Sequence, residues 1–242
     1  MSDWITFLPY LIVGAAVAIF FVLMMSVSLW EKQYIRQLEP AARDALGPTS
    51  PYFEAMNLAA PARSFIPCGT FYRLPRTAAA NTYMAAWLSP DRTTLACIIG
   101  GKVAKLKFLK TLLLTWVEDE KFLVTRDDFG ETDHSHTLEV EVVLNADFEE
   151  LVIRHEQRLG VCGSLPRPLD PASVAALWER IEEIRARKLV AGGLARFVDE
   201  PRGIWRYTFR GGWKNFSTVF TQIKDHKKYA DRLKKKRPGL EA

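Results

Sequence analysis

The feature that most constrains this chain is a strongly apolar run without a charged residue, from Ile5 to Leu29. Trp4 and Trp30 bracket the run, as aromatic residues do at the two interfaces of a membrane. About 20 apolar residues in a helix span a hydrocarbon core of about 30 Å, so this run is long enough to cross a bilayer. The sequence therefore predicts a transmembrane anchor with a single span over residues 1–30.

A cleaved secretory signal is the alternative interpretation of the same run. Such a signal starts with positive charge, has an apolar centre of about 7–15 residues and ends in small residues. Ser26 and Ser28 could mimic the cleavage site, but the chain starts Met-Ser-Asp-Trp and the apolar run is longer. The residues favour a permanent anchor.

The flanks of the run predict its orientation. The N-terminal flank has no basic residue, whereas Lys32, Arg36 and Arg43 follow the run. Basic residues collect on the cytoplasmic side, so we expect the N-terminus outside and the C-terminal domain in the cytoplasm of a cell membrane. Gly14 and Ala18 lie four residues apart, which allows either a lipid-facing patch or a homodimer through the span.

The three cysteines agree with this orientation. Cys68, Cys97 and Cys162 are odd in number, widely spaced and without a CxxC pair. Such a pattern is typical of reduced thiols in a cytoplasmic compartment rather than of a disulfide framework.

Beyond the span, the pattern predicts an α+β fold with a mainly antiparallel sheet and packed helices. Residues 31–67 are expected to form a juxtamembrane helix, continuing over Glu31–Leu46 with a kink at Pro40, and then a linker at Gly47–Pro51. Residues 68–223 are expected to form the α+β domain. The predicted strands are Phe71–Leu74, Thr82–Leu88, Thr93–Ile99, Val103–Phe108, Thr111–Val117, Phe122–Thr125 and Thr137–Leu144.

Turn and cap residues delimit these elements. Turns are predicted at Ser89–Arg92, at Gly100–Gly101 and at Glu118–Glu120. The predicted helices are one from Asn145 to Gly160 and one capped by Asp170 that ends at Gly192, with Glu182 and Arg185 paired on its wet side. A short hairpin is expected from Leu194–Val198 and Ile204–Phe209.

A loop rich in acidic residues and histidine, Asp127–His136, is the candidate for metal chemistry. In a strand, His134 and His136 would point to the same face, and a carboxylate could complete a metal site. A solvated hairpin loop is the competing interpretation, and the chain has no HExxH motif. We therefore assign no metal ligand from the sequence.

Other candidates for catalysis lack partners. His155 lies on the apolar side of its predicted helix, with Arg154 and Arg158 expected to be solvated beside it. A packed histidine is the interpretation favoured here, because no nucleophile or carboxylate partner is identifiable. Cys68 is interpreted as structural. The motifs for phosphate or dinucleotide binding and the nucleophile elbow are absent, so no cofactor is expected.

The C-terminal tail, residues 224–242, carries the positive charge. Between Lys224 and Arg237 eight basic and two acidic residues give a balance of +6, so the rest of the chain sums to −1. Trp213 and Phe216 begin an apolar stripe before it, which could pack on the sheet or lie on a membrane. The membrane-surface candidates are Lys224, Lys227, Lys228, Arg232, Lys234, Lys235, Lys236 and Arg237. No fold motif supports nucleic-acid binding by these charges.

The segments Trp87–Ala96, Leu114–Trp116 and Leu123–Thr125 carry a resemblance over roughly residues 68–210. Their arrangement resembles a group of uncharacterised bacterial proteins in which a single span precedes a small α+β domain. The resemblance implies the same architecture, but no activity, cofactor or site residue.

Two functions are open from the sequence. The first is a cytoplasmic interaction or scaffold module at the membrane surface, whose basic tail faces anionic headgroups or a protein partner. The second is a membrane-tethered enzyme of unrecognised type with a site near His134 and His136. The sequence does not decide whether the chain is an enzyme.

Overall fold

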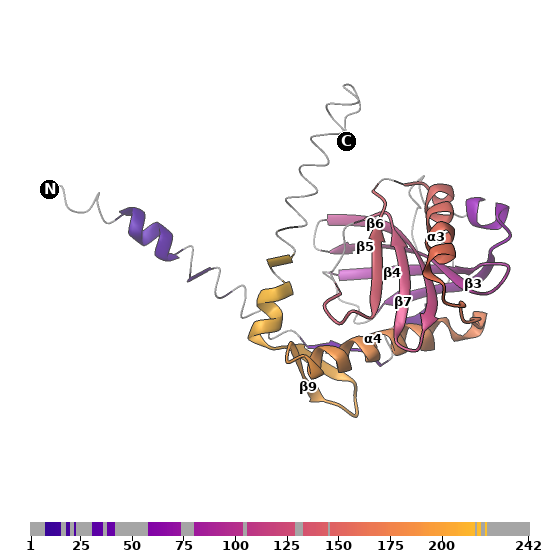
Figure 1. Cartoon of the computed structure of the whole chain (residues 1–242). Coiled ribbons are helices and arrows are strands. Elements are labelled where there is room, and N and C mark those ends of the chain that lie inside the picture. The colour runs from indigo at the N-terminus through magenta and orange to yellow at the C-terminus, as the bar shows by residue number, and fades with distance from the viewer. Residues whose placement is uncertain are drawn as a thin grey trace, which may run out of the picture. The chain divides into compact units, whose positions relative to one another are not determined.

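A computed structural model of the chain describes the elements that position its side chains (Figure 1). The described residues are 8–15, 18–19, 22, 31–35, 38–41, 58–73, 80–103, 106–128, 133–144, 146–215, 217–218 and 221. The chain is divided into two compact units. One unit is Tyr34–Arg185, and the other combines Met1–Gln33 with Ala186–Ala242.

A seven-stranded sheet forms the centre of the unit Tyr34–Arg185. Its strands are β2 (Leu38–Ala41), β3 (Ile66–Arg73), β4 (Ala80–Leu88), β5 (Thr94–Val103), β6 (Leu106–Glu118), β7 (Lys121–Arg126) and β8 (Leu138–Val142). They lie side by side in sequence order (Figure 1). Neighbours from β2 to β7 are antiparallel, and β8 runs parallel to β7 at the edge.

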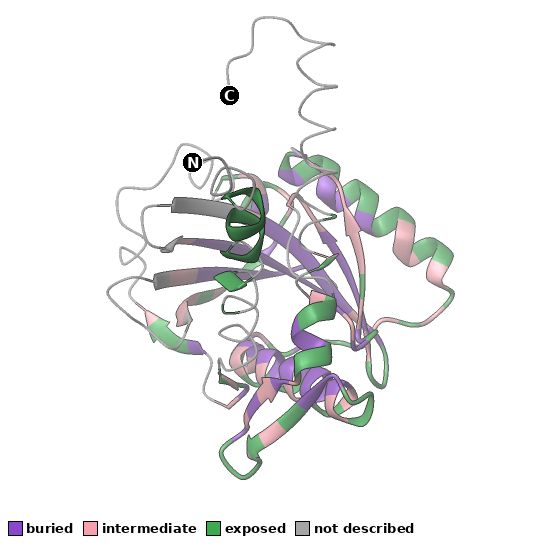
Figure 2. Ribbon diagram, turned by 90° about the vertical axis from the view of Figure 1, so that its left-hand side faces the viewer, coloured by how far each residue is buried: buried purple, intermediate pink, exposed green. Residues whose placement is uncertain are grey.

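Helices cover both faces of this sheet. Successive strand residues point to opposite faces, so Met84, Ala86 and Leu88 belong to one core cluster and Ala85 and Trp87 to another. The first cluster packs against α4 (Val174–Ala191), and the second packs against α3 (Phe148–Cys162) and a helical turn at residues 58–62. Figure 2 shows the buried residues along the central strands in purple.

Local signals begin and end the helices. The Asp147 side chain accepts a hydrogen bond from the backbone N–H of Glu150 at the start of α3, and Gly163 ends this helix with a φ of 69°. Asp170 caps a 3-10 turn, η2 (Pro171–Ser173), which leads directly into α4. Proline fits there because the first helical turn needs no backbone N–H donor.

The other unit contains a three-stranded antiparallel sheet. Its strands are β1 (Lys32–Gln33), β10 (Ile204–Tyr207) and β9 (Ala195–Asp199), with β10 in the middle. The rings of Trp205 and Tyr207 meet edge to face at a centroid distance of 5.2 Å. Lys32 Nζ lies 4.8 Å from the Tyr207 centroid, which adds a cation–π contact between β1 and β10.

The predicted α+β class with a mainly antiparallel sheet is confirmed. The tight turn after β4 forms as predicted, with the Arg92 N–H donating to the Ser89 carbonyl at 2.9 Å. The hairpin of β9 and β10 also forms where the sequence predicted it. The prediction of a turn at Gly100–Gly101 was wrong. Both glycines continue β5, with Gly100 opposite Tyr83 on one side and Leu109 on the other.

The helix predicted over Glu31–Leu46 was also wrong, because Lys32–Gln33 and Leu38–Ala41 are strands. Pro40 pairs with Phe71 in β2, which is an edge strand. Proline is tolerated at an edge because no neighbour on the outer side needs its missing backbone N–H. The sequence of this polar segment therefore predicted a helix, but pairing with β10 and β3 makes its described parts extended.

Three further details differ from the predictions. β6 is one strand where two, Val103–Phe108 and Thr111–Val117, were predicted. β8 pairs in parallel with β7, whereas the short spacings predicted antiparallel pairing. The cap of α3 is Asp147 rather than Asn145.

The predicted span Ile5–Leu29 is described only at residues 8–15, 18–19 and 22, of which 8–15 form one helical segment. Over the described part of the chain, no helix combines the length and the apolar character that crossing a bilayer requires. The linker Gly47–Pro51 and the basic tail from Lys224 lie outside the described residues.

Candidate functional site

The predicted acid and histidine site lies in the connection between β7 and β8, described at residues 127–128 and 133–137. His134 lies in a turn, and His136 has a left-handed backbone with a φ of 56°. His134 is half-buried and His136 is exposed. The two histidines are not in a strand, so the common face predicted for them does not arise from strand alternation.

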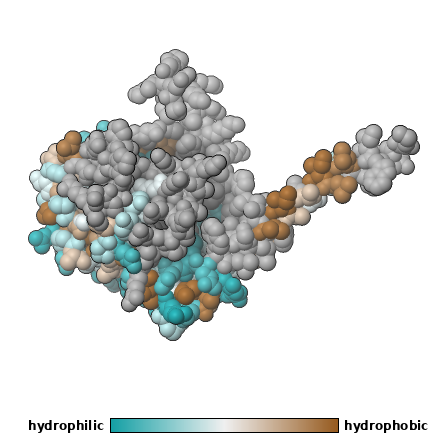
Figure 3. All heavy atoms as spheres, turned by 180° about the vertical axis from the view of Figure 1, so that it is seen from behind, coloured by the Kyte–Doolittle hydropathy of each residue, from teal (hydrophilic) through white to brown (hydrophobic). Residues whose placement is uncertain are grey.

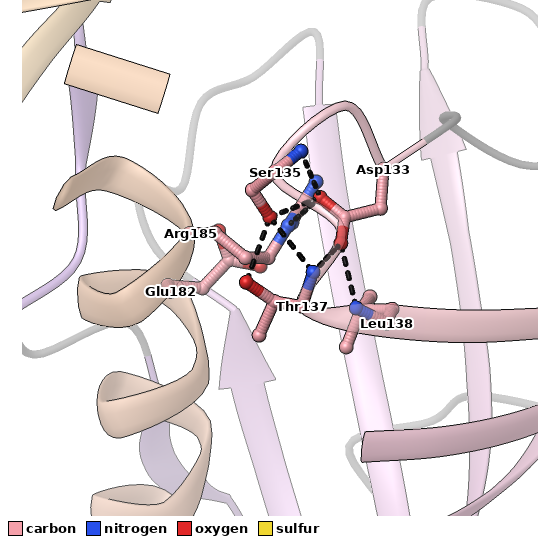
Figure 4. A network of polar contacts seen from close by, with 6 residues as sticks. All are labelled: Asp133, Ser135, Thr137, Leu138, Glu182 and Arg185. Carbon is pink, nitrogen blue, oxygen red and sulfur yellow. Dashed lines mark hydrogen bonds and ion pairs between the residues drawn. The ribbon is translucent and has the colours of Figure 1, made fainter. Parts of the chain in front are cut away.

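Asp133 organises this loop (Figure 4). Its Oδ2 atom accepts hydrogen bonds from the backbone N–H of Thr137 at 2.8 Å and of Leu138 at 2.6 Å. Its Oδ1 atom accepts from the backbone N–H of Ser135 at 3.1 Å and from the Ser135 hydroxyl at 2.5 Å. The carboxylate thus fixes the entrance to β8.

Arg185 completes the network from α4. Its Nε lies 3.2 Å from Asp133 Oδ1, and its Nη1 lies 2.7 Å from Glu182 Oε1. The predicted pair of Glu182 and Arg185 exists, but both residues are buried instead of lying on the wet side of the helix. Burial disfavours the ionised Asp133, yet the charge of Arg185 and the hydrogen bonds from Ser135 and Leu138 outweigh it and lower the pKa of this carboxyl.

These contacts give Asp133 a structural role, because they tie the loop before β8 to α4. In the described ranges, no three Cys, His, Asp or Glu side chains are grouped so that they could hold a metal ion.

A second polar cluster lies buried under α3. His155 exposes 1% of its surface and faces the sheet. Its Nε2 lies 2.9 Å from Thr115 Oγ1 on β6, and its Nδ1 lies 2.9 Å from Thr125 Oγ1 on β7. Thr115 Oγ1 lies 2.8 Å from Thr94 Oγ1 on β5. The predicted packed histidine is confirmed, with hydrogen bonds to both ring nitrogens.

Arg158 sets the direction of these hydrogen bonds. Its Nη1 donates to Thr125 Oγ1 at 2.9 Å and to the Val124 carbonyl at 2.5 Å. A guanidinium can only donate, so of the two side chains that contact Thr125 Oγ1, only His155, through Nδ1, can accept its hydroxyl proton. The expectation that Arg158 is a solvated surface residue was wrong, since its side chain exposes only 13%.

The directions of the remaining hydrogen bonds follow from the protonation state of His155. Burial, and then the charge of Arg158, lower the pKa of His155 to about 3, so the neutral ring has one N–H. With Nδ1 accepting, Nε2–H donates to Thr115, and Thr115 donates to Thr94. The reverse order would leave the Thr125 proton buried without an acceptor, at a cost of about 1–3 kcal/mol.

Thr94 ends this series of hydrogen bonds among the described residues, and it lines a cavity of about 280 Å³. Phe65, Leu113, Val152 and Leu159 form the apolar part of its lining. His155 also lines it, so the polar cluster under α3 reaches the cavity directly.

Charged residues line the same cavity. Asp91 is held by the Ser89 hydroxyl at 2.5 Å and the Thr93 hydroxyl at 2.8 Å. Although partial burial opposes ionisation, these hydrogen bonds lower the pKa of Asp91. Arg63 forms ion pairs with Glu149 and with Glu156, the latter at 3.5 Å between Nη1 and Oε1. The lining residues Arg63, Asp91 and Glu156 therefore sum to a charge of −1.

Sequence reasoning missed the threonines of this cluster. Thr94, Thr115 and Thr125 were read only as strand formers. Their signal was available, because they occupy buried positions on one face of three successive strands, next to apolar residues such as Ala96 and Leu113. Their convergence on His155 depends on sheet register, which the sequence pattern did not supply.

The remaining candidates are placed as follows. Cys68 is half-buried and Cys97 is buried, and neither is in a disulfide. Burial, together with the charge of Asp170, raises the pKa of the Cys68 thiol to about 11, which is consistent with a structural thiol. Trp213 exposes 50% of its surface. The membrane-surface candidates of the tail, from Lys224 to Arg237, lie outside the described residues.

Comparison with protein-family models, with curated proteins and with solved structures finds no significant match to this chain.

Proposed function

We propose that this chain is a single-pass membrane protein whose α+β domain acts as an interaction module at the cytoplasmic membrane surface. The carrying observation is the exposure of its N-terminal apolar residues. Leu11 and Val22 expose 63% and 68% of their surface. Figure 3 shows the described part of this segment as hydrophobic spheres. An apolar surface of this kind is stable when lipid or another apolar helix covers it.

The free thiols support a cytoplasmic location of the α+β domain. Cys68, Cys97 and Cys162 are all reduced in the structure. Cys97 lies in the core between β4 and β6, where burial raises its thiol pKa and makes the thiolate inaccessible. This agrees with the basic residues that follow the apolar run.

The basic tail supports a role at the membrane surface. Each Lys or Arg near an anionic leaflet contributes about 1 kcal/mol of attraction. A chain already held by a span has a high local concentration at the bilayer, so even weak headgroup binding by residues 224–237 is sufficient. A domain held in this way would recruit a protein partner to the membrane surface.

A membrane-tethered enzyme with a site near His134 and His136 is the alternative, with less support. The carboxylate next to these histidines, Asp133, already accepts hydrogen bonds from three backbone N–H groups, the Ser135 hydroxyl and Arg185. A His134→Ala and His136→Ala variant that lost a measured turnover would restore this alternative.

The anchor is tested by placing arginine in the apolar run. Val13→Arg with Val17→Arg should release the protein from membranes during alkaline extraction, since each arginine costs about 2.5–3.5 kcal/mol in a membrane centre. The matched control is Val161→Arg with Leu165→Arg, at positions exposed by 87% and 90%, which should remain in the pellet. Equal release of the wild-type protein by alkali would contradict the anchor.

A further inference from the structure

We propose that the cavity beneath α3 is a binding site for a small, uncharged or cationic carbonyl compound with a short aliphatic body. The carbonyl oxygen would accept a hydrogen bond from the Thr94 hydroxyl. This inference concerns the unit Tyr34–Arg185 and does not depend on the membrane anchor.

The direction of the buried hydrogen bonds argues for an acceptor on the ligand. Arg158 donates to Thr125, and the protons then point in sequence through His155 and Thr115 toward Thr94. With Thr94 Oγ1 accepting from Thr115, its own proton is available to an acceptor in the cavity that Thr94 lines. A carbonyl oxygen is a strong partner for such a polarised donor.

The charges around the cavity argue against an anionic ligand. Asp91 and Glu156 outweigh Arg63 in the lining, and Arg63 is already paired with Glu149 and Glu156. A carboxylate or phosphate entering this site would meet net negative charge, and the one cation among the described lining residues, Arg63, is already paired. An amide or a protonated amine does not meet this penalty.

The size and the walls set the rest of the chemistry. A volume of about 280 Å³ is at the lower limit for ligand cavities, which admits a small molecule rather than a nucleotide. Leu113 on β6 and Val152 on α3 provide an aliphatic surface from opposite layers. A branched chain of four or five carbons would contact both.

The test titrates 4-methylpentanamide into the full-length protein in detergent micelles and follows the methyl resonances of Leu113, Val152 and Leu159. Saturable shifts at these methyl groups are expected with the amide. The carboxylate of the same skeleton, 4-methylpentanoate, should bind at least about tenfold more weakly because of the negative lining.

Two variants at Thr94 make the test specific. Thr94→Val keeps the shape without the hydroxyl and should weaken amide binding about tenfold, whereas Thr94→Ser keeps the donor and should bind like the wild type. Unchanged amide binding by Thr94→Val would overturn the proposal, as would the absence of saturable shifts in the wild type. Equal binding of the carboxylate would overturn the assigned ligand class. A folded methyl spectrum of Thr94→Val away from the cavity guards against loss of structure as the cause of weaker binding.

Discussion

At the residue scale, His155 shows how a titratable side chain becomes part of a core. Its two ring nitrogens are matched by threonines on adjacent strands, so burial leaves neither nitrogen without a partner. Arg158 lies beside it and opposes its protonation. The ring therefore works as a fixed link between one donor and one acceptor.

This arrangement predicts the pH dependence of stability. The pKa of His155 falls from 6.5 to about 3 on folding, so the unfolded chain binds a proton that the folded chain does not. The contribution of neutral His155 to the free energy of unfolding is complete above about pH 6.5. It is lost as the pH falls toward 3. As the pH decreases from about 6.5 to about 5, the free energy of unfolding should fall by up to about 1.4 kcal/mol for each pH unit.

The measurement is denaturant unfolding of the wild type and His155→Gln across that pH range. Glutamine retains a donor and an acceptor but does not titrate, so its slope should be smaller by the contribution of this one group. Parallel slopes in the two proteins would show that His155 is not protonated on unfolding.

Single residues were predictable where one local rule decides their role. The cap at Asp170 follows from the Asp-Pro pair that starts a helix, and the structure confirms it. Asp133 was predicted only as one acid in a polar loop. Its role depends on Arg185, a residue 52 positions away, and no local pattern indicates that contact.

At the element scale, strands with alternating or β-branched residues were predicted well. β4 and β7 lie within a few residues of their expected bounds. β1 and β2 were missed, because Lys32–Gln33 and Leu38–Ala41 have no strand pattern of their own and become extended through pairing with β10 and β3. The local sequence does not encode such pairing partners.

Close packing at one glycine gives a prediction for the helical residues 209–215. A Cβ at Gly211 would lie 1.8 Å from the Leu194 carbonyl oxygen, so the backbone of one segment must move. Gly211→Ala should lower the free energy of unfolding by about 1–3 kcal/mol or more through overpacking. Thermal or denaturant unfolding, followed by circular dichroism, measures this change.

Gly160→Ala is the matched control on α3. Apart from its chain neighbours and the backbone of its own helix, no atom lies within 4 Å of a Cβ at that position. Alanine also favours a helix, so this variant should be neutral or slightly stabilising. Equal stability of the two variants would contradict the close approach of Gly211 and Leu194.

At the scale of the whole molecule, an apolar run of about 25 residues precedes a folded α+β unit with free cysteines. The fold class was predictable because periodicity and turn residues agree along most of residues 66–191. The cavity was not predictable, because its lining comes from the segment before β3, the β4–β5 turn, β6 and α3, which only the three-dimensional fold brings together.

The most direct measurement is the protease accessibility of a C-terminal tag in intact and in permeabilised cells, combined with alkaline extraction of membranes. For an anchored domain that faces the cytoplasm, the tag should be protected in intact cells, be cleaved after permeabilisation, and remain with the alkali-resistant membrane fraction. Cleavage of the tag in intact cells, or release of the wild-type protein by alkali, would contradict a membrane-anchored domain that faces the cytoplasm.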